Sequence, residues 1–421
     1  MWVRKRIDIR STDHAFGLFS CLIPANRQRL AKRVEQKLRS DDAVACLSVR
    51  SGFDLVLSEL ELPAESEVLF SAITIPDMVK IVESHGQVAV PIDLDPHSLA
   101  PQLEALERAV TSKTRVLIVA HLFGGRMDMD PIIEFARQHN LLVVEDCAQA
   151  FDGGEYLGHP ESDIVMFSFG PIKTSTALGG ALIRIPDQRL RDRVRRAQAE
   201  YPVQRRRTYF GRLIKYLGLR IVSMRPIYTL MAWIFGKLGI SLDRVANGSV
   251  RGFSGPNFFR RIRRQPSAPL LAMMLRRISR FSSERLELRA DNGRFLADQL
   301  ENCIPSPGHA ASPHSFWLVP IVVDNPQLAI EILARHGFDA TQGQSLCVVQ
   351  PPTGREERAA LEAQELMSKI IFLPCYADMP KPVLEQLAKA LLEHHELHGY
   401  SFRTVETATC DGLPRPSSLT V

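Results

Sequence analysis

Short apolar runs alternate with helix-period stretches over the first half of the chain. The runs have the length of buried strands and cover residues 43–49, 67–70, 88–92, 115–120, 141–145, 163–169 and 181–185. Helix-period stretches such as residues 78–85 and 131–139 lie between several of them. This alternation predicts an α/β fold in which a mainly parallel sheet carries helices on both faces. Reactive groups in such sheets gather beyond the carboxyl ends of the strands.

The pattern changes after Arg189. Residues 189–207 are basic with a helical period, and residues 209–240 mix cations with Leu, Ile, Trp and Tyr. Helical stretches at 270–300 and 382–394, with strands at 316–323 and 370–373, predict a small α+β lobe. The predicted organisation has five parts: an N-terminal arm (1–30), a large lobe (31–200), a basic insertion (201–264), a connecting helix with the small lobe (265–398) and a disordered tail (399–421).

Composition narrows the class of protein. With 421 residues, 45% of them hydrophobic and 24% charged, the chain is globular and long enough for two lobes. Seven scattered cysteines without a CxxC pair indicate free thiols in a reducing compartment, and we assign no metal site. We find neither a signal peptide nor an apolar run long enough to span a bilayer, so we expect a cytoplasmic protein.

The positive charge is concentrated in one segment. The net charge is +5, yet residues 201–282 hold seventeen Lys or Arg and a single acid, Asp243. Cations interleaved with apolar residues over 201–264 predict a segment that lies on an anionic membrane surface, where each cation contributes about 1 kcal/mol. Two alternatives remain open: the apolar face packs on the protein or a second subunit, or the arginines bind phosphates of a substrate or nucleic acid. No nucleic-acid fold is recognisable, so we expect no nucleic-acid partner.

An acid and a lysine follow adjacent predicted strands. Asp146 ends one strand, and Lys173 lies in a small-residue loop after the next. This pair suits pyridoxal 5'-phosphate chemistry, in which the lysine forms a Schiff base and the carboxylate keeps the pyridine nitrogen protonated. Ser168 and backbone amides at residues 51–53 could bind the cofactor phosphate. The ordinary alternative is that Asp146 caps a helix and Lys173 is solvated.

The same stretches resemble the DegT/StrS family of pyridoxal-phosphate sugar aminotransferases, which have the aspartate-aminotransferase fold (fold type I). Residues 145–150 read EDCAQA, and residues 167–173 read FSFGPIK before the glycine pair Gly179-Gly180. Weaker matches lie at residues 92–95, 121–130 and 372–374. The resemblance is good over about residues 43–196 and fair over 270–393.

The resemblance implies a role for each matching residue. Lys173 would be the Schiff-base lysine and proton shuttle, and Asp146 would face the pyridine nitrogen. Gln149 would lie near the phenolic oxygen of the cofactor, and Ser168 with the Gly52 region would bind its phosphate. Family members with His in place of the lysine are dehydratases, so Lys173 favours transamination.

Other positions depart from the family pattern. Ile75 stands where the family commonly stacks an aromatic ring on the cofactor, and the SGT motif reads Ser51-Gly52-Phe53. Asn257 is a candidate for the asparagine that reaches the phosphate of the neighbouring subunit.

Two histidines are further site candidates. His121 ends a predicted strand, where it either lines the substrate pocket or makes a structural hydrogen bond. His314 stands just before the first strand of the small lobe and is expected to line the substrate pocket.

These observations predict a homodimeric pyridoxal-phosphate aminotransferase. By resemblance it moves an amino group from glutamate or glutamine to a keto-sugar, nucleotide- or lipid-linked, or to a cyclitol, in a ping-pong reaction. The basic segment would hold it on the inner face of the cytoplasmic membrane. The alternatives are another pyridoxal-phosphate reaction at the membrane, such as decarboxylation or acyl condensation, and a catalytically inactive scaffold.

Overall fold

A seven-stranded sheet forms the centre of the large lobe. The computed structural model describes residues 1–4, 6–38, 41–237, 257–343, 345–394 and 397. The strands are β1 (Ala43–Cys46), β2 (Glu67–Ser71), β4 (Val88–Ile92), β5 (Thr114–Ala120), β6 (Leu142–Asp146), β7 (Ile164–Ser168) and β8 (Ala181–Arg184). Their order is β1-β8-β7-β6-β5-β2-β4, in which β8 is antiparallel to both neighbours and the remaining pairs are parallel. All seven predicted strands form, although the first, expected over 43–49, ends at Cys46 and a helix begins at Val49.

Helices cover both faces of this sheet, as the alternation of side chains along buried strands requires. In β5, Val116 and Ile118 join the core under α3 (Val49–Leu60), α4 (Pro76–Ser84) and α7 (Gln188–Glu200). Leu117 and Val119 join the opposite core, under α5 (Leu103–Ala109) and α6 (Asp130–Gln138). A third cluster packs the β1, β7 and β8 part of that second face against α2 (Arg27–Glu35) and α12 (Ala268–Ser279).

Two predicted helices are each divided in two, so these predictions were wrong in extent. The helix expected over 189–207 ends with α7 at Glu200, and α8 (Arg206–Val222) begins after Tyr201-Pro202. Proline disfavours helical backbone at the preceding residue, which explains this break. The helix expected over 270–300 divides into α12 and α13 (Ser283–Leu300), and Ser282 caps the second helix by accepting from Arg285 N–H.

The small lobe packs α13, α14 (Pro326–Arg335) and α16 (Lys381–Leu392) on an antiparallel pair of strands, β9 (Val319–Val322) and β11 (Ile370–Leu373). The helix α15 (Leu361–Lys369) lies between this lobe and the large one, with Ala363 and Leu366 in a shared cluster. A two-residue pairing of β3 (Ile73–Thr74) with β10 (Cys347–Val348) also connects the lobes. Short helical segments are η1 (Gln36–Leu38), α11 (Phe258–Ile262) and η2 (Glu356–Arg358).

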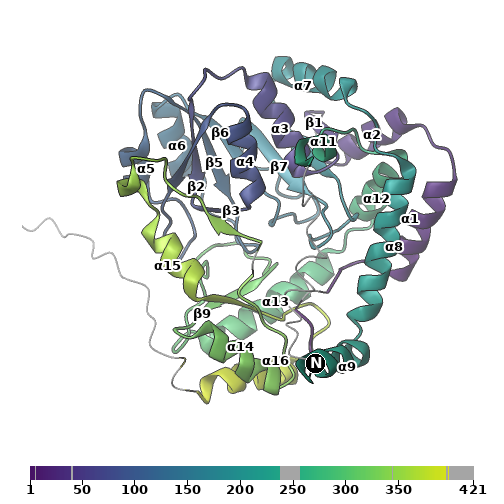
Figure 1. Ribbon diagram of the computed structural model, residues 1–421, viewed down its shortest axis with the longest axis vertical. Helices are drawn as coiled ribbons and strands as arrows, with labels where there is room; N and C mark the ends of the chain where they lie inside the picture. The colour runs from purple at the N-terminus through teal and green to yellow at the C-terminus, as the bar shows by residue number, and fades with distance from the viewer. Residues whose placement is uncertain (5, 39–40, 238–256, 344, 395–396, 398–421) are drawn as a thin grey trace, which may run out of the picture.

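The arm and the basic segment pack together at one edge of the molecule. Helix α1 (Ser11–Leu22) lies beside α8, and α9 (Arg225–Lys237) follows at the end of α8 (Figure 1). Tyr209, Leu213 and Tyr216 of α8 are buried in the core, so its inner face packs on the protein itself. Among the described residues, no helix is both long and apolar enough to cross a bilayer. The expected tail at 399–421 and residues 238–256 of the insertion lie outside the described residues, and the five-part division remains a proposal.

Candidate active site

Asp146 and Lys173, the acid and the lysine singled out in the sequence, lie at the carboxyl end of the sheet and line one cavity. Strand β6 ends at Asp146, its parallel neighbour β7 ends at Ser168, and Lys173 follows in the loop to β8. The cavity has a volume of about 1420 Å³ and lies between the large lobe, the small lobe and the N-terminal arm. Asp146, Gln149, Ser168 and Lys173 all line it, so the fold brings these predicted residues together.

The Lys173 amine is desolvated and lies against an aromatic ring. Burial lowers its pKa to about 8, although the nearby Asp146 carboxylate raises it. Its Nζ lies 4.0 Å from the ring centroid of Trp317, whose indole N–H donates to the Ile172 carbonyl at 2.8 Å. A pKa this close to neutrality gives the amine a substantial uncharged, nucleophilic fraction at physiological pH.

A hydrogen bond from the Ala148 amide holds the Asp146 carboxylate in position. Burial raises its pKa, while the hydrogen bond from Ala148 N–H to Oδ1 (2.9 Å) and the charge of Lys173 lower it. A buried carboxylate in a cavity is stabilised in its charged form by a cationic hydrogen-bond donor. A protonated pyridine nitrogen is such a donor, so Asp146 fits a pyridoxal ring.

Gln149 and Ser168 have donors to offer to a ligand in this cavity. The Gln149 carbonyl accepts from Phe123 N–H at 2.9 Å, which leaves its amide N–H groups as the donating end. The Ser168 hydroxyl accepts weakly from Gly170 N–H at 3.4 Å and keeps its own proton to donate. Together with Lys173 and Asp146, these groups match the aldehyde, ring nitrogen and polar oxygens of pyridoxal phosphate.

Residues 51–53, the expected phosphate contact, do not line the cavity, but the turn before them does. Helix α3 begins at Val49, so the amide of Gly52 is already bonded to the Ser48 carbonyl, and Ser51 N–H and hydroxyl are both bonded to the Ser48 hydroxyl. Phe53 is fully buried in the core. The cavity is lined by Ser48, Val49 and Arg50 instead, at the end of the helix where amides lack intrahelical partners.

Gly52 serves packing rather than ligand approach. A Cβ at this position would lie 2.4 Å from Ile183 Cγ1 on β8, so the glycine lets α3 lie close to the sheet. Gly52 therefore faces the strand and not the cavity.

Ile75 and Asn257 occupy different environments. Ile75 lines the cavity at the start of α4, where its proposed contact with the cofactor ring can be made. Asn257 precedes α11, is exposed and does not line the cavity of its own chain. Its expected contact with a neighbouring subunit remains a prediction.

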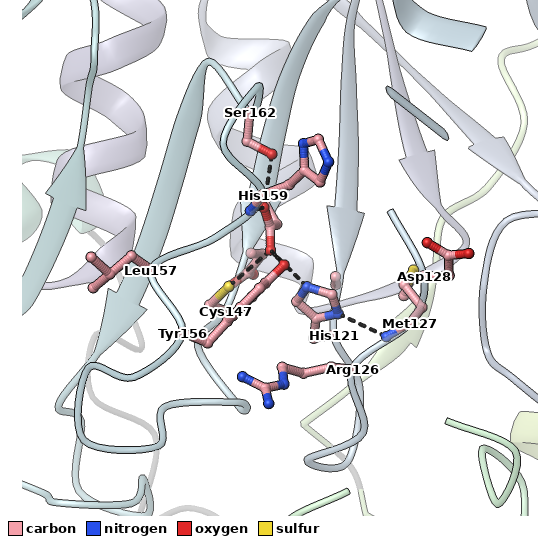
Figure 2. Close-up of polar contacts among 12 residues, drawn as sticks. His121, Arg126, Met127, Asp128, Cys147, Tyr156, Leu157, His159 and Ser162 are labelled. Carbon is pink, nitrogen blue, oxygen red and sulfur yellow. Dashed lines mark hydrogen bonds and ion pairs between the residues drawn. The ribbon is translucent and has the colours of Figure 1, made fainter. Parts of the chain in front are cut away.

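His121 does not line the cavity and instead makes structural hydrogen bonds, which was the alternative to a pocket role. It is fully buried behind the strand ends, where Nε2 donates to Glu145 at 2.8 Å and Nδ1 accepts from Met127 N–H at 3.3 Å (Figure 2). Successive side chains of a strand point to opposite faces of the sheet, so Glu145 and Asp146 of β6 point to opposite sides. The histidine is therefore part of the support behind Asp146 rather than a pocket residue.

Glu145 is the centre of that support. Further donors to its carboxylate are the Tyr156 and Ser162 hydroxyls at 2.6 and 2.7 Å, the His159 amide at 2.7 Å and the Cys147 thiol at 3.4 Å (Figure 2). Burial opposes ionisation, but the bonds from His121, Tyr156 and Ser162 lower the pKa to about 2. The sequence motif contained this glutamate, but only the fold shows how many donors surround it.

His314 does not line the cavity, whereas Trp317, three residues further along, does. Burial lowers the His314 pKa to about 4, and its Nδ1 accepts from Phe316 N–H, outside the cavity. The segment bonds to the large lobe through Ser315 N–H to Gly124 and Leu318 N–H to Phe123, which places Trp317 on the cavity wall. In the sequence, Trp317 could have been noticed as an aromatic residue near the start of the expected strand at 316–323.

Arginines that the sequence did not single out surround the same cavity. Arg212 and Arg220 of α8 line it together with Tyr216, at the four-residue spacing of one helix face. Arg289 of α13 lines it from the other side. The inner face of α8 thus contributes positive charge to the cavity, and this charge suits an anionic ligand.

Comparison with solved structures defines the fold class. The chain matches the aminotransferase TlmJ from Streptoalloteichus hindustanus with a TM-score of 0.67 at 16% identity, over 93% of this chain and 99% of the other. It matches the GDP-4-keto-6-deoxy-D-mannose-3-dehydratase of E. coli, solved with hydrated pyridoxal phosphate, with a TM-score of 0.66 at 12% identity, over 93% and 99%. The architecture is therefore that of fold type I.

A family model matches part of the chain. Residues 24–222 match the model of the DegT/DnrJ/EryC1/StrS aminotransferase family. A GDP-perosamine synthase from Caulobacter vibrioides is 32% identical over 171 residues, which is 40% of this chain and 46% of the relative. A UDP-4-amino-4-deoxy-L-arabinose–oxoglutarate aminotransferase from Shewanella sediminis is 31% identical over 156 residues, 37% and 40% of the two chains. The matches span less than half the length of these curated relatives.

Proposed function

We propose that this protein is a pyridoxal-phosphate-dependent aminotransferase that acts on a keto-sugar. The observation that carries the proposal is the meeting of Lys173 and Asp146 at adjacent strand ends in one cavity. The family match over the lobe that holds both residues supports it. The names of the relatives, a GDP-perosamine synthase and a UDP-4-amino-4-deoxy-L-arabinose–oxoglutarate aminotransferase, favour a sugar acceptor.

The residues of the chain have distinct tasks in this proposal. When bound, the cofactor supplies an aldehyde for the lysine amine and a ring that takes up electrons from the reacting carbon. Asp146, held by Ala148 N–H, keeps a proton on the ring nitrogen. Lys173, with its pKa lowered to about 8, accepts and returns the proton that moves between substrate and cofactor carbons. Ser168 and the first turn of α3 hold the phosphate.

The acceptor is proposed to carry an anionic group, such as the phosphates of a nucleotide or a lipid carrier. Arg212 and Arg220 on the inner face of α8 reach the cavity that holds Lys173, and arginine binds phosphate oxygens in a bidentate geometry. A cyclitol without such a group would leave this positive wall unused. Glutamate or glutamine is proposed as the donor.

Amino transfer from labelled glutamate tests this function. Protein saturated with pyridoxal phosphate is incubated with ¹⁵N-glutamate and nucleotide-linked or lipid-linked 4-keto-sugars, and the amino-sugar is measured by mass spectrometry. We expect ¹⁵N in a product from wild type and none from Lys173→Ala. An intact cofactor band without transfer from any donor would favour decarboxylation or acyl condensation, and no cofactor binding would favour a scaffold.

We also propose that the outer face of α1, α8 and α9 lies on an anionic membrane surface. Large apolar side chains are exposed there: Phe19, Leu22, Ile23, Phe210, Ile214, Ile221, Leu230, Trp233 and Ile234. The exposed cations Arg207 and Lys215 lie among them, and neither α8 nor α9 contains an acid. Cations with an apolar face complement anionic headgroups and acyl chains better than they complement another basic surface.

Vesicle sedimentation tests this surface. The triple variant Phe19→Ser, Ile214→Ser, Trp233→Ser removes apolar area without changing charge. Its matched control, Leu103→Ser, Leu288→Ser, Leu361→Ser, removes exposed leucines elsewhere. We expect only the first variant to lose binding to phosphatidylglycerol vesicles. If the wild type does not bind vesicles, and the first variant differs from it in oligomeric state, a second copy of the chain covers this face instead.

The cytoplasmic location and the homodimer remain proposals as well. Asn257 is exposed before α11, where the resemblance would have it reach a neighbouring subunit. Light scattering of the purified protein measures the oligomeric state, and a monomer at all concentrations would remove the dimer.

A further inference from the structure

Arg289 occupies a position between the two lobes, close to the lysine loop. It projects from α13 of the connecting region, its Nε donates to the Ser315 carbonyl at 2.9 Å, and its two terminal nitrogens both approach the Thr174 hydroxyl at 3.3 Å. Thr174 follows Lys173 directly, and Ser315 lies two residues before Trp317, whose ring lies over the Lys173 amine. The guanidinium is therefore anchored on both sides of the reactive lysine.

The charge of Arg289 is not matched by a nearby acid. Among the described residues, no carboxylate oxygen lies within 4.0 Å of its guanidinium. Three other arginines that line the cavity differ in this respect, since Arg50 pairs with Asp77, Arg277 with Asp13, and Arg285 with Asp378. A buried charge without a partner is costly, so such a site favours an anion from outside the chain.

The Arg289 guanidinium is largely removed from water, although the side chain lines the cavity. Burial lowers the Arg289 pKa to about 10, and the more distant Asp8 raises it only in part. Both terminal nitrogens share one neutral oxygen at a distance that is long for an N–H···O bond. A carboxylate would give the planar fork two acceptor oxygens in its preferred bidentate geometry.

We propose that Arg289 binds a carboxylate of the amino donor beside Lys173. This inference rests on the proposed aminotransferase function, which requires an amino acid whose nitrogen reaches the lysine side of the cavity. Binding through Arg289 would hold the donor at the junction of α13, the lysine loop and the small lobe. The cations on α8 would remain for the acceptor, which uses the cavity in the other half of the ping-pong cycle.

The test measures binding of glutarate, a dicarboxylate that has no amino group to react. Isothermal titration calorimetry on protein saturated with pyridoxal phosphate gives its affinity for wild type, Arg289→Gln and Arg289→Lys. Hydrogen bonds to a charged group typically contribute enough that Arg289→Gln should weaken glutarate by about ten- to a hundredfold. Arg289→Lys keeps the charge but loses the fork, so we expect an intermediate loss.

Arg285→Gln is the matched control. Arg285 lies one turn earlier on α13 and lines the same cavity, but it is paired with Asp378. If the loss of any cavity cation weakened glutarate equally, binding would be a general charge effect and the proposal would be overturned. Thermal melts of all variants check folding, and Arg289→Lys decides the outcome if Arg289→Gln does not fold.

A second titration distinguishes the source of the anion. Inorganic phosphate replaces glutarate, since a phosphate of the acceptor or cofactor could use the same guanidinium. Weakening of phosphate but not glutarate in Arg289→Gln would overturn the donor assignment, as would a wild type that does not bind glutarate. The proposed function fails by a different result, namely the absence of Lys173-dependent cofactor binding, so the two failures are distinguishable.

Discussion

The buried carboxylate of Glu145 should contribute stability that depends on pH. Its pKa is about 2 in the folded protein, against an ordinary value of 4.5. Because the folded value is the lower one, the contribution is complete above about pH 5 and is lost as the pH falls from 4.5 towards 2. At about 1.4 kcal/mol per pKa unit, this shift corresponds to about 3 kcal/mol of unfolding free energy at neutral pH.

Glu145→Gln tests this reasoning. Glutamine cannot accept from all the donors around the carboxylate, so at pH 7 the variant should be about 3 kcal/mol less stable than wild type. Urea unfolding followed by far-UV circular dichroism at several pH values between 7 and 3 measures the difference. The difference should shrink as the pH falls below 4.5. Glu65→Gln, which removes an exposed glutamate paired with Lys113, is the control. A constant difference across this pH range would refute the account of Glu145.

Three further predictions concern the lysine and the glycines. Cofactor association should accelerate with pH, reach half of its maximal rate near pH 8, where half of the Lys173 amine has lost its proton, and level off above that pH; a rate that is flat from pH 6 to 9 would contradict this. Trp317→Leu removes an attraction of about 1–2 kcal/mol for the ammonium form, so that levelling should shift to lower pH by about one unit, measured in the same assay. Gly52→Ala should lower the free energy of unfolding by about 1–3 kcal/mol, because the added Cβ would collide with Ile183. Gly211→Ala, whose added Cβ would meet open space on α8, should not lower it. Equal melting temperatures of the two variants would refute the packing role of Gly52.

The sequence was sufficient to predict the sheet and the placement of Lys173 and Asp146 after adjacent strands. Its apolar runs are short and bounded by turns, and the strands they predict all form, because a strand buried on both faces is hydrophobic along its whole length. Lys173 and Asp146 were recognisable because their motifs are local in sequence, and the order of the strands brings the two together.

Residues whose direction depends on tertiary packing could not be assigned in this way. His121 and His314 lie near strand ends as expected, but their side chains turn away from the cavity into hydrogen bonds with Glu145 and Phe316 N–H. Trp317 and Arg289 come from the small lobe and the connecting helix, more than a hundred residues after Lys173. Sequence spacing carries no information about such long-range contacts.

The basic insertion (201–264) also shows that sequence spacing does not reveal which way side chains point. Its composition predicted one apolar face, but α8 has a buried face that packs on the core, arginines that line the cavity, and exposed apolar residues on the outside. Only the packing of α8 against α1 and α12 separates these three sets of residues.

The most direct test of the central claim is an absorbance spectrum of the purified protein with pyridoxal phosphate, with wild type beside Lys173→Ala and before and after glutamate. The account predicts a visible band in wild type that Lys173→Ala lacks and that glutamate bleaches. A wild type without the band, or with a band that Lys173→Ala retains unchanged, would contradict the assignment of Lys173 and with it the proposed catalytic function.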